Sequence, residues 1–418
     1  MLFFLRSVVL PLCVVAMVTM LGSCAADSPL SPSAPGSLIR VDSLTSYSVE
    51  RLAWVTGEGL DLFFRGGTKS PDDYRSQLAT PQQAVRLFKV AYASVIPERG
   101  GQAVTAYGLV AIPENVAPGA PIVSYQHGTI FDRSWVPSNP DGSLETQFMI
   151  SQFASHGYIV IAPDYFGTTE GTTVPNSYFV EQSTAQACLD MYRASRVMLE
   201  QRGITPGKLF LHGWSQGGYS TLAMLRAMEL ENIAVEATVT ASGPADPLLF
   251  VSEMLNNPSP LAAPFTIGGL TNLMLSIDAY QGLDGYIDVA LNPAFVEKAR
   301  ALHQFELSFE DFATKVPLNL DSVCTPQFFS DSRAAVKPFW KILDASAPYR
   351  FRMQSALRAF YSYRDEAIPW QVARIAADYQ QTVGNVRAEA IDAGQDTDHR
   401  AVFISSLVSC KPWFDSLK

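Results

Sequence analysis

Residues 208–218 read Lys-Leu-Phe-Leu-His-Gly-Trp-Ser-Gln-Gly-Gly, an apolar run that ends in a turn of small residues around Ser215. The run at 208–212 has the length of a buried strand, and residues 219–228 have the composition of a helix. A Gly-x-Ser-x-Gly turn between a strand and a helix holds the serine hydroxyl clear of the sheet, because the small residues let the flanking backbones approach. We therefore expect Ser215 to be a nucleophile. The alternative is a tight turn whose serine only caps the next helix.

The rest of the chain alternates between strand-like and helix-like segments. Two β-rich runs, 85–94 and 105–112, flank the turn-forming residues 97–101 and predict an antiparallel hairpin. Further apolar runs bounded by turn residues lie at 121–125, 158–162, 208–212, 235–241, 357–363 and 386–393. Helix-like segments separate most of them, and residues 178–203 show the helical spacing of apolar residues well. This order predicts an α/β fold with a mostly parallel sheet and an antiparallel N-terminal hairpin.

Residues 246–345 do not show this alternation. Apolar residues recur at helical spacing near 270–280 and 295–302, while Asn- and Pro-rich breaks separate such segments. We expect residues 246–345 to form a helical cap inserted into a core made of residues 45–245 and 346–418. The alternative is a second, independent domain.

The beginning of the chain has the features of an export signal. Arg6 precedes an almost uninterrupted apolar run at residues 8–21, which is short for a membrane span and contains Pro11. We expect residues 1–23 to be a signal peptide. A retained transmembrane helix is the alternative.

The residues after this run resemble a lipid attachment site. Leu21-Gly-Ser-Cys24 resembles the lipobox of bacterial lipoproteins, which implies that Cys24 carries a lipid and anchors an exported protein to a membrane of the cell envelope. Plain secretion is the alternative. The Ser- and Pro-rich sequence that follows indicates a flexible tether, and we assign residues 24–44 to it.

Charge and composition exclude some classes of partner. The chain has 418 residues, and forty Asp and Glu outnumber thirty Lys and Arg to give a net charge of -10. Because this leaves no broad basic field to gather phosphates, nucleic acid is not expected as a partner. A hydrophobic content of 48% indicates a globular protein and not a disordered chain.

The cysteine and histidine pattern gives no sign of a metal site, because no CxxC or HExxH spacing occurs. Three cysteines follow the signal and anchor, namely Cys188, Cys324 and Cys410. Export exposes them to an oxidising compartment. Since Cys188 lies in a helix-like stretch, we expect any disulfide to join Cys324 to Cys410.

A second turn follows the apolar run at 121–125. His127-Gly128-Thr129 ends that run and offers backbone amides. When a serine attacks a carbonyl, two preorganised N–H donors stabilise the negative oxygen by about 3 to 4 kcal/mol each. We expect the amides of Gln216 and Thr129 to form this oxyanion hole, and Gly128 of the same turn to contribute to it. His127 is then expected to hold the turn by hydrogen bonds, unless it is simply a buried histidine with satisfied partners.

A serine nucleophile needs a base, and the chain has five histidines. Four have positions that suit other roles: His127 in the turn, His156 before a strand, His212 inside a strand and His303 in the cap. His399 lies in a polar loop after the last apolar run, from which a base could reach Ser215. A solvent-exposed loop histidine is the alternative.

The base in turn needs a carboxylate to orient it. Asp365 follows the run at 357–363 in a turn, with Pro369 at the start of the next helix, and is our first candidate. Asp246 competes because it follows another strand. Asp396 and Asp398 are too near His399 in sequence to orient it well.

The order Ser215, Asp365, His399 is the order found in α/β-hydrolases. From Val85 to Val408 the chain resembles this superfamily, and in particular its secreted lipases and esterases that carry an inserted cap. The segments that carry the resemblance are His127-Gly-Thr129, the Gly-x-Ser-x-Gly turn, Ala162-Pro-Asp-Tyr-Phe-Gly167, Asp365-Glu-x-x-Pro369 and Asp398-His399. The oxyanion turn lacks the Gly-Gly extension of many carboxylesterases, and residues 38–84 carry no recognised motif.

The resemblance implies an α/β-hydrolase fold and hydrolysis of a small carboxylic ester through an acyl-enzyme, with no cofactor or metal. Two alternatives remain. A serine aminopeptidase would need a cap carboxylate to hold a substrate ammonium, for which Glu253 and Asp278 are candidates. An anchored binding protein of the same fold would have lost its activity.

Overall fold

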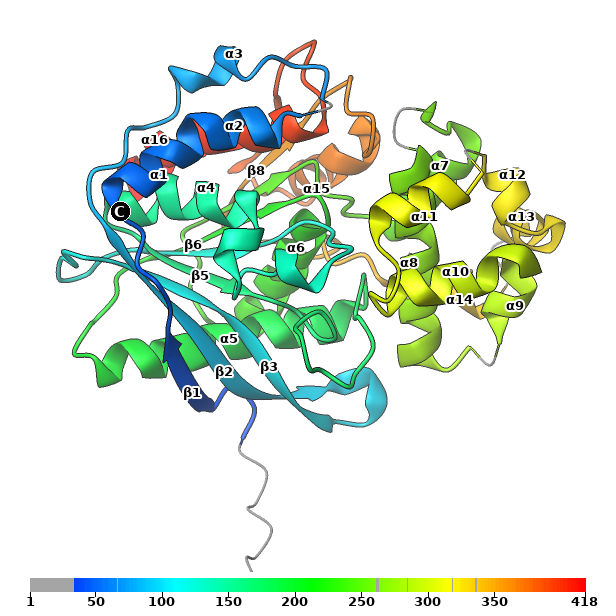
Figure 1. The fold of residues 1–418 in the computed structure, drawn as a ribbon, viewed down its shortest axis with the longest axis horizontal. Coiled ribbons are helices and arrows are strands. Elements are labelled where there is room, and N and C mark those ends of the chain that lie inside the picture. The colour runs from blue at the N-terminus through cyan, green and yellow to red at the C-terminus, as the bar shows by residue number, and fades with distance from the viewer. Residues whose placement is uncertain (1–33, 66, 261–262, 284, 318, 335–336) are drawn as a thin grey trace, which may run out of the picture. The chain divides into compact units, whose positions relative to one another are not determined.

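The predicted apolar runs form the strands of one sheet (Figure 1). The computed structural model describes residues 34–418, apart from residues 66, 261–262, 284, 318 and 335–336. Within this part the sheet has nine strands in the order β1-β2-β3-β5-β4-β6-β7-β8-β9. The strands are β1 (Leu38–Ser43), β2 (Val85–Ile96), β3 (Gln102–Pro113), β4 (Ile122–Gln126), β5 (Ile159–Pro163), β6 (Leu209–Trp214), β7 (Ala237–Ala241), β8 (Ala356–Tyr361) and β9 (Ala388–Asp392).

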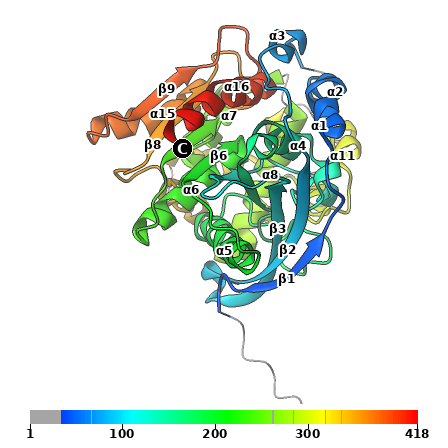
Figure 2. The same cartoon turned by 90° about the vertical axis from the view of Figure 1, so that its left-hand side faces the viewer.

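The expected antiparallel hairpin and the expected mostly parallel sheet are both confirmed. β2 and β3 pair antiparallel from Val85 opposite Pro113 to Ile96 opposite Gln102, and the short turn η1 (Pro97–Arg99) joins them. Each neighbouring pair from β5 through β4, β6, β7 and β8 to β9 is parallel. Figure 2 shows β1, β2 and β3 at one edge of the sheet and β8 and β9 at the other.

The edge strand β1 corrects the expected boundary between the tether and the folded core. Leu38–Ser43 pairs antiparallel with β2, from Leu38 opposite Tyr92 to Ser43 opposite Phe88. These residues were expected to belong to a flexible tether at 24–44, but they form a paired strand. The physical reason is the free edge of β2, whose backbone groups β1 satisfies by hydrogen bonding.

Helices cover both faces of the sheet and bury its apolar side chains. One face packs against α5 (Glu181–Gln201), α6 (Gln216–Leu230) and α15 (Trp370–Thr382). The other face packs against α1 (Val49–Thr56), α2 (Glu58–Phe63), α4 (Leu144–Gln152) and α16 (His399–Leu417). The short helix α3 (Asp72–Arg75) contacts α16 through Tyr74, whose hydroxyl lies 3.2 Å from the Ser405 hydroxyl. The segment 38–84, which carried no recognised motif, therefore supplies one edge strand and part of a helical layer.

Helices α7 to α14 lie between β7 and β8, where an inserted cap was expected. They are α7 (Pro247–Asn256), α8 (Ala263–Gln281), α9 (Tyr286–Ala290), α10 (Pro293–His303), α11 (Phe309–Lys315), α12 (Leu320–Val323), α13 (Pro326–Ala334) and α14 (Pro338–Ala345). They share an apolar cluster of their own, which Phe131, Tyr178 and Tyr219 join from the sheet side. Residues 34–418, which include these helices, form one compact unit.

The three cysteines correct another expectation. Cys188, Cys324 and Cys410 are all free and buried. Cys324 belongs to the apolar cluster of the cap, whereas Cys410 packs among the helices that cover the sheet. The expected Cys324–Cys410 disulfide is therefore wrong, because the two side chains belong to separate cores.

The chain start is outside the described residues, including the expected signal peptide at 1–23 and the expected lipid attachment at Cys24. Among the residues that are described, no helix has both the length and the apolar composition needed to cross a membrane. In the same part of the chain, no three His, Cys, Asp or Glu side chains gather as they would around a metal ion.

Candidate active site

The turn between β6 and α6 presents Ser215 in a strained backbone conformation. Ser215 has φ +57° and ψ -127°. This backbone conformation is unfavourable in free energy for any residue other than glycine. The surrounding backbone enforces it: the Ser215 N–H donates to the Ala241 carbonyl oxygen at 2.9 Å, and the Gly218 N–H donates to the Ser215 carbonyl oxygen at 2.8 Å. The turn therefore holds the hydroxyl at the carboxyl end of β6.

Glycines make this turn sterically feasible. A Cβ on Gly217 would lie 1.8 Å from the Gln126 carbonyl oxygen, and a Cβ on Gly213 would lie 2.1 Å from the Gly217 carbonyl oxygen. No side chain fits at either position. The glycine requirement read from the sequence thus has a direct cause in the close approach of β4, β6 and α6.

A chain of hydrogen bonds joins Ser215, His399 and Asp365. The Ser215 hydroxyl lies 3.0 Å from His399 Nε2. His399 Nδ1 lies 3.0 Å from each carboxylate oxygen of Asp365. Burial disfavours the charged imidazole, but the charge of Asp365 and its hydrogen bond outweigh burial and raise the pKa of His399. The three residues from distant parts of the sequence therefore meet as expected from their order.

His399 is placed by a helix and not by a loop, which corrects the expectation. It is the first residue of α16, and Asp398 caps that helix by accepting the Ala401 N–H at 2.9 Å. The other Asp398 oxygen accepts the backbone N–H of Thr68 at 2.7 Å and of Lys69 at 3.2 Å. Asp398 thus fixes the helix start to the N-terminal layer.

The other candidate acids have different partners. Asp246 caps α7 through the Leu249 N–H, and its second oxygen lies 2.9 Å from both Tyr349 Oη and Arg350 Nη2. It does not contact His399. Asp396 lines a separate cavity, which is described below.

His156, His212 and His303 have no contact with Ser215; His212 and His303 are buried, and His156 is partly buried. Burial lowers the pKa of His156 to about 4 and that of His212 to about 3. His212 Nε2 lies 3.0 Å from Ser406 Oγ, and His303 Nδ1 in the cap lies 2.5 Å from Asn272 Oδ1. These partners suit structural roles.

Two amides near Ser215 are available for an oxyanion. Thr129 and Gln216 both line a narrow hollow at Ser215, and neither backbone N–H donates to an acceptor within the described residues. Gly128, which was expected to contribute to the same hole, has its N–H directed to Glu145 Oε2 at 3.0 Å. Its amide is occupied, so the expected set narrows to Thr129 and Gln216.

His127 supports this turn from behind. Its Nδ1 lies 2.8 Å from the Gly128 carbonyl oxygen, and its Nε2 lies 3.2 Å from the Asp164 carbonyl oxygen. The ring stacks on Tyr165 with centroids 4.2 Å apart. Burial lowers the pKa of His127 to about 4, so the imidazole is neutral near pH 7 and acts by hydrogen bonding.

Glu145 is a residue that the sequence did not reveal. Its Oε2 accepts hydrogen bonds from Tyr125 Oη at 2.5 Å and from the Gly128 N–H, and its side chain borders the same hollow as Ser215 and His399. Burial raises the pKa of Glu145 to about 7. No short motif surrounds Glu145, so only the fold brings this carboxyl to the turn.

Two further side chains that the sequence did not single out support the acid and the base. The Ser242 hydroxyl donates to Asp365 Oδ2 at 2.5 Å, and Glu366 Oε2 accepts the His399 N–H at 3.0 Å. Glu366 was part of the quoted Asp-Glu-x-x-Pro segment, but its contact with His399 depends on tertiary structure.

Ser215 opens onto a cavity of about 570 Å³ between the sheet and the cap. Core residues Trp214, Glu145 and His399 border it on one side, and Phe265 and Phe309 of the cap border it on the other. A small-molecule substrate could therefore reach the Ser215 hydroxyl directly.

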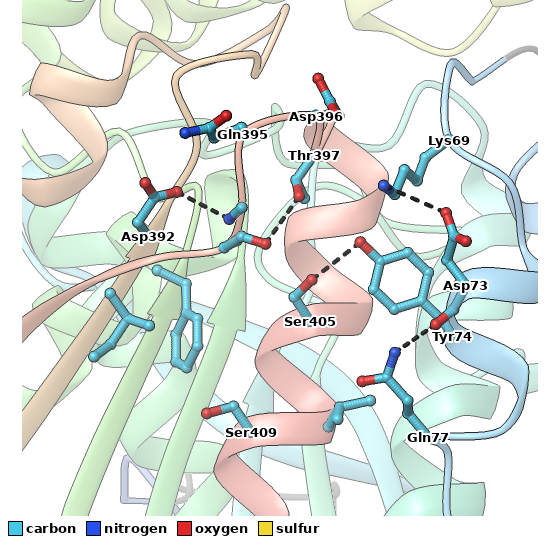
Figure 3. A pocket seen from close by; sticks show the side chains of 15 residues that line it. Lys69, Asp73, Tyr74, Gln77, Asp392, Gln395, Asp396, Thr397, Ser405 and Ser409 are labelled. Carbon is cyan, nitrogen blue, oxygen red and sulfur yellow. Dashed lines mark hydrogen bonds and ion pairs between the residues drawn. The ribbon is translucent and has the colours of Figure 1, made fainter.

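Another cavity, of about 470 Å³, lies behind the loop that precedes His399 (Figure 3). Asp396 and Thr397 border it, together with Lys69 and Asp73 from the N-terminal layer, which form an ion pair at 3.3 Å. It includes neither Ser215 nor His399, so it is separate from the candidate active site.

Comparisons with known proteins agree with this architecture. The sequence model of the secretory lipase family matches residues 143–232, which run from α4 to α6 and contain the Ser215 turn. No curated protein is similar enough in sequence to match the chain.

Solved structures match most of the chain at low sequence identity. A putative hydrolase from Legionella pneumophila is 22% identical with a TM-score of 0.77, over 90% of this chain and 98% of that one. The rice cell wall degrading esterase LipA from Xanthomonas oryzae is 20% identical with a TM-score of 0.76, over 92% of this chain and 100% of that one. Candida antarctica lipase A is 17% identical with a TM-score of 0.60, over 88% and 78%. The chain therefore has the α/β-hydrolase fold.

Proposed function

We propose that the protein is an exported serine hydrolase that cleaves carboxylic esters, with Ser215 as nucleophile, His399 as base and Asp365 as orienting acid. The observation that carries the proposal is the unbroken hydrogen-bond chain from Ser215 Oγ through His399 to Asp365. A serine alcohol becomes nucleophilic when a neighbouring base removes its proton in the transition state.

In the first half of the reaction His399 Nε2 accepts the Ser215 proton as Oγ bonds to the ester carbonyl carbon. The carbonyl oxygen becomes negative and accepts hydrogen bonds from the amides of Gln216 and Thr129. The bond to the alcohol oxygen then breaks, and the imidazolium returns the proton to that oxygen. Asp365 stabilises the positive ring throughout, as the raised pKa of His399 indicates.

In the second half a water molecule takes the place of the alcohol. His399 removes a proton from the water, whose oxygen bonds to the acyl carbon of the Ser215 ester. The bond to Oγ breaks, the proton returns to Ser215, and the carboxylic acid leaves. The cycle uses groups of this chain and water alone.

Esters are favoured over peptides by two observations. The match to secretory lipases covers the nucleophile turn, and solved neighbours include an esterase and a lipase. The cap carboxylates suggested for an aminopeptidase, Glu253 and Asp278, do not border the cavity of about 570 Å³. Export agrees with the match to secretory lipases, and a lipid anchor at Cys24 remains part of the proposal on the sequence pattern alone.

Labelling with a fluorophosphonate probe tests the proposal. The probe phosphonylates an activated serine, so we expect the wild type to be labelled and to hydrolyse p-nitrophenyl acetate, and Ser215→Ala to do neither. Ser195→Ala is the matched control, because Ser195 is buried in α5 and donates to the Met191 carbonyl oxygen. Failure of the folded wild type to take up the probe would refute the catalytic proposal and leave an inactive binding protein.

A further inference from the structure

Two hollows meet at Ser215 and differ greatly in size. The larger has a volume of about 570 Å³, and the smaller has about 20 Å³. Thr129, Ser215, Phe265 and Ala367 border both, so an ester bound at Ser215 would extend one end into each. The smaller volume holds roughly one water-sized group.

The position of the base assigns the two ends of the ester. His399 must give its proton to the leaving alcohol oxygen, so the alcohol lies on the His399 side of the reacting carbon. His399 borders the larger hollow and not the smaller one. The smaller hollow borders Ser215 and Gln216 but not His399, so the acyl group, at the other end of the ester, is assigned to it.

Apolar walls close the smaller hollow, which we call the acyl crevice. Its walls include Tyr178, Phe179, Phe250, Met254, Phe265 and Ile368. The rings of Tyr178 and Phe179 pack with centroids 4.7 Å apart, and Phe179 lies 4.6 Å from Tyr219. Tyr178 Oη is held by Thr129 Oγ1 at 2.9 Å. Because the rings brace one another, a longer chain would have to displace several of them.

The larger hollow has mixed chemistry. Arg65, Arg400 and Glu366 border it alongside Phe63 and Trp214. Such a surface accepts an alcohol moiety that carries both polar groups and an apolar face.

We propose, resting on the proposed function, that the enzyme is selective for esters of a very short acyl group, of the size of acetyl, with a much larger and partly polar alcohol. The acyl crevice sets the acyl limit, and Phe250 and Met254 of α7 determine it.

A series of p-nitrophenyl esters with two, four, six and eight acyl carbons tests the limit. An added methylene that a site has no room for costs roughly tenfold or more in kcat/KM. We expect the acetate to be hydrolysed best, with kcat/KM at least about tenfold lower at six carbons. A preference for the eight-carbon ester would overturn the proposal.

Truncation of the crevice wall tests which residues set the limit. We expect Phe250→Ala and Met254→Ala, made separately, to raise the ratio of hexanoate to acetate hydrolysis by about tenfold. Leu255→Ala is the matched control, because Leu255 is on the same helix and packs against the cap core without bordering the crevice. An unchanged ratio in both folded wall variants would refute the assignment.

Fluorophosphonate labelling separates this proposal from the proposed function. A labelled wild type that prefers long acyl chains would refute only the acyl crevice. An unlabelled wild type would refute the catalytic proposal itself.

Discussion

Asp365, the proposed orienting acid, has several hydrogen-bond partners besides His399. Its Oδ2 accepts a hydrogen bond from the Ser242 hydroxyl at 2.5 Å. Its Oδ1 accepts hydrogen bonds from the backbone N–H groups of Ala367 and Ile368 at 2.9 Å each. These donors fix the position of the carboxylate beside His399. A neutral side chain of the same shape would keep part of this network but could not stabilise the imidazolium.

For Asp365→Asn we expect kcat to fall by about 10⁴-fold, because an amide favours the wrong tautomer of His399. Removal of the negative charge also lowers the pKa of His399. The base must be neutral, so activity is lost as pH falls below that pKa, and the acidic limb of the pH profile should move to lower pH. Steady-state kinetics on p-nitrophenyl acetate between pH 5 and 9 measure both effects.

The rejected acid provides the comparison. Asp246→Asn removes half of an ion pair with Arg350 but leaves the triad untouched. We expect lower stability and nearly unchanged kcat. If Asp246→Asn lost activity as severely as Asp365→Asn while remaining folded, the acid would be misassigned.

Glu145 links the oxyanion turn to pH. Its folded-state pKa of about 7 lies above the ordinary 4.5, so the native protein binds the proton more tightly than the unfolded chain does. The protonated form therefore contributes stability below pH 4.5, and this contribution is lost as pH rises through about 7.

We expect Glu145→Gln, which stays neutral, to gain stability relative to the wild type as pH rises from 4.5 to above 7. The difference between the two pKa values corresponds to about 3 kcal/mol. Urea unfolding of both proteins at pH 4.5 and pH 8 measures it, and comparison of the two proteins cancels other titrating groups. A stability difference that is independent of pH would mean that Glu145 keeps an ordinary pKa.

At the scale of residues, short sequence motifs were enough to predict the site residues that directly follow an apolar run. Ser215, Asp365 and His399 each follow an apolar run, so their meeting at one edge of the sheet follows from strand order. Glu145 and Ser242 could not be found in this way. Glu145 lies in a helix whose sequence gives no sign that Gly128 will contact it, and Ser242 contacts Asp365 across 123 positions of sequence.

At the scale of elements, the Ser215 turn depends on the contact of α6 with β4. The Gly217 backbone lies against the Gln126 carbonyl group, with no room for a methyl group between them. Strand β4 also leads into the oxyanion turn. Separation of α6 from β4 would therefore displace both Ser215, the proposed nucleophile, and the turn that carries Thr129, the proposed oxyanion donor.

We expect Gly217→Ala to lower the free energy of unfolding by about 3 kcal/mol or more, because the added Cβ forces the helix from the strand. The loss of activity should be larger than the loss of folded protein can explain. Chemical unfolding and probe labelling measure the two effects.

Gly269→Ala is the control for this substitution. Its Cβ would meet no atom nearer than Tyr178 Oη at 3.5 Å, and it lies in the middle of α8. Higher helix propensity should make it as stable as the wild type or slightly more so. Equal destabilisation by the two substitutions would show that the close approach at Gly217 is unimportant.

Strands with continuous apolar runs were predictable from the sequence. β4 to β8 have buried runs because helices cover both faces of the sheet, and each expected run overlaps a strand. β9 was also expected, from the run at 386–393, although Ala388 is its only buried residue. β1 is an edge strand with Ile39 half exposed, so its sequence lacks that pattern. His399 was expected in a loop but is the first residue of α16, because Asp398, read as part of that loop, caps the helix.

At the scale of the whole molecule, the proposed lipid at Cys24 would hold the folded unit near a membrane. The sequence between Cys24 and β1 would set the distance between the enzyme and the lipid surface. The cavity of about 570 Å³ at Ser215 would then lie near a membrane. No helix in the described residues is long and apolar enough to cross that membrane.

We expect Cys24→Ser to abolish incorporation of an alkyne-tagged fatty acid in cells and to release the protein from the membrane fraction. Cys13→Ser, within the expected signal peptide, should leave both unchanged. Continued lipid labelling of Cys24→Ser would place the attachment elsewhere, and absence of labelling in the wild type would favour plain secretion.

The hairpin tip bears on how this protein could be re-engineered. Arg99 in η1 donates to the Ala279 carbonyl oxygen of α8 at 2.9 and 3.2 Å, and its guanidinium lies 5.2 Å from the centre of the Tyr280 ring. The turn between β2 and β3 thus contacts the C-terminal end of cap helix α8. A chimera that replaces residues 247–345 with the insertion of another protein would remove the Ala279 carbonyl oxygen that accepts from Arg99. Such a chimera must therefore exchange the insertion and the turn η1 together.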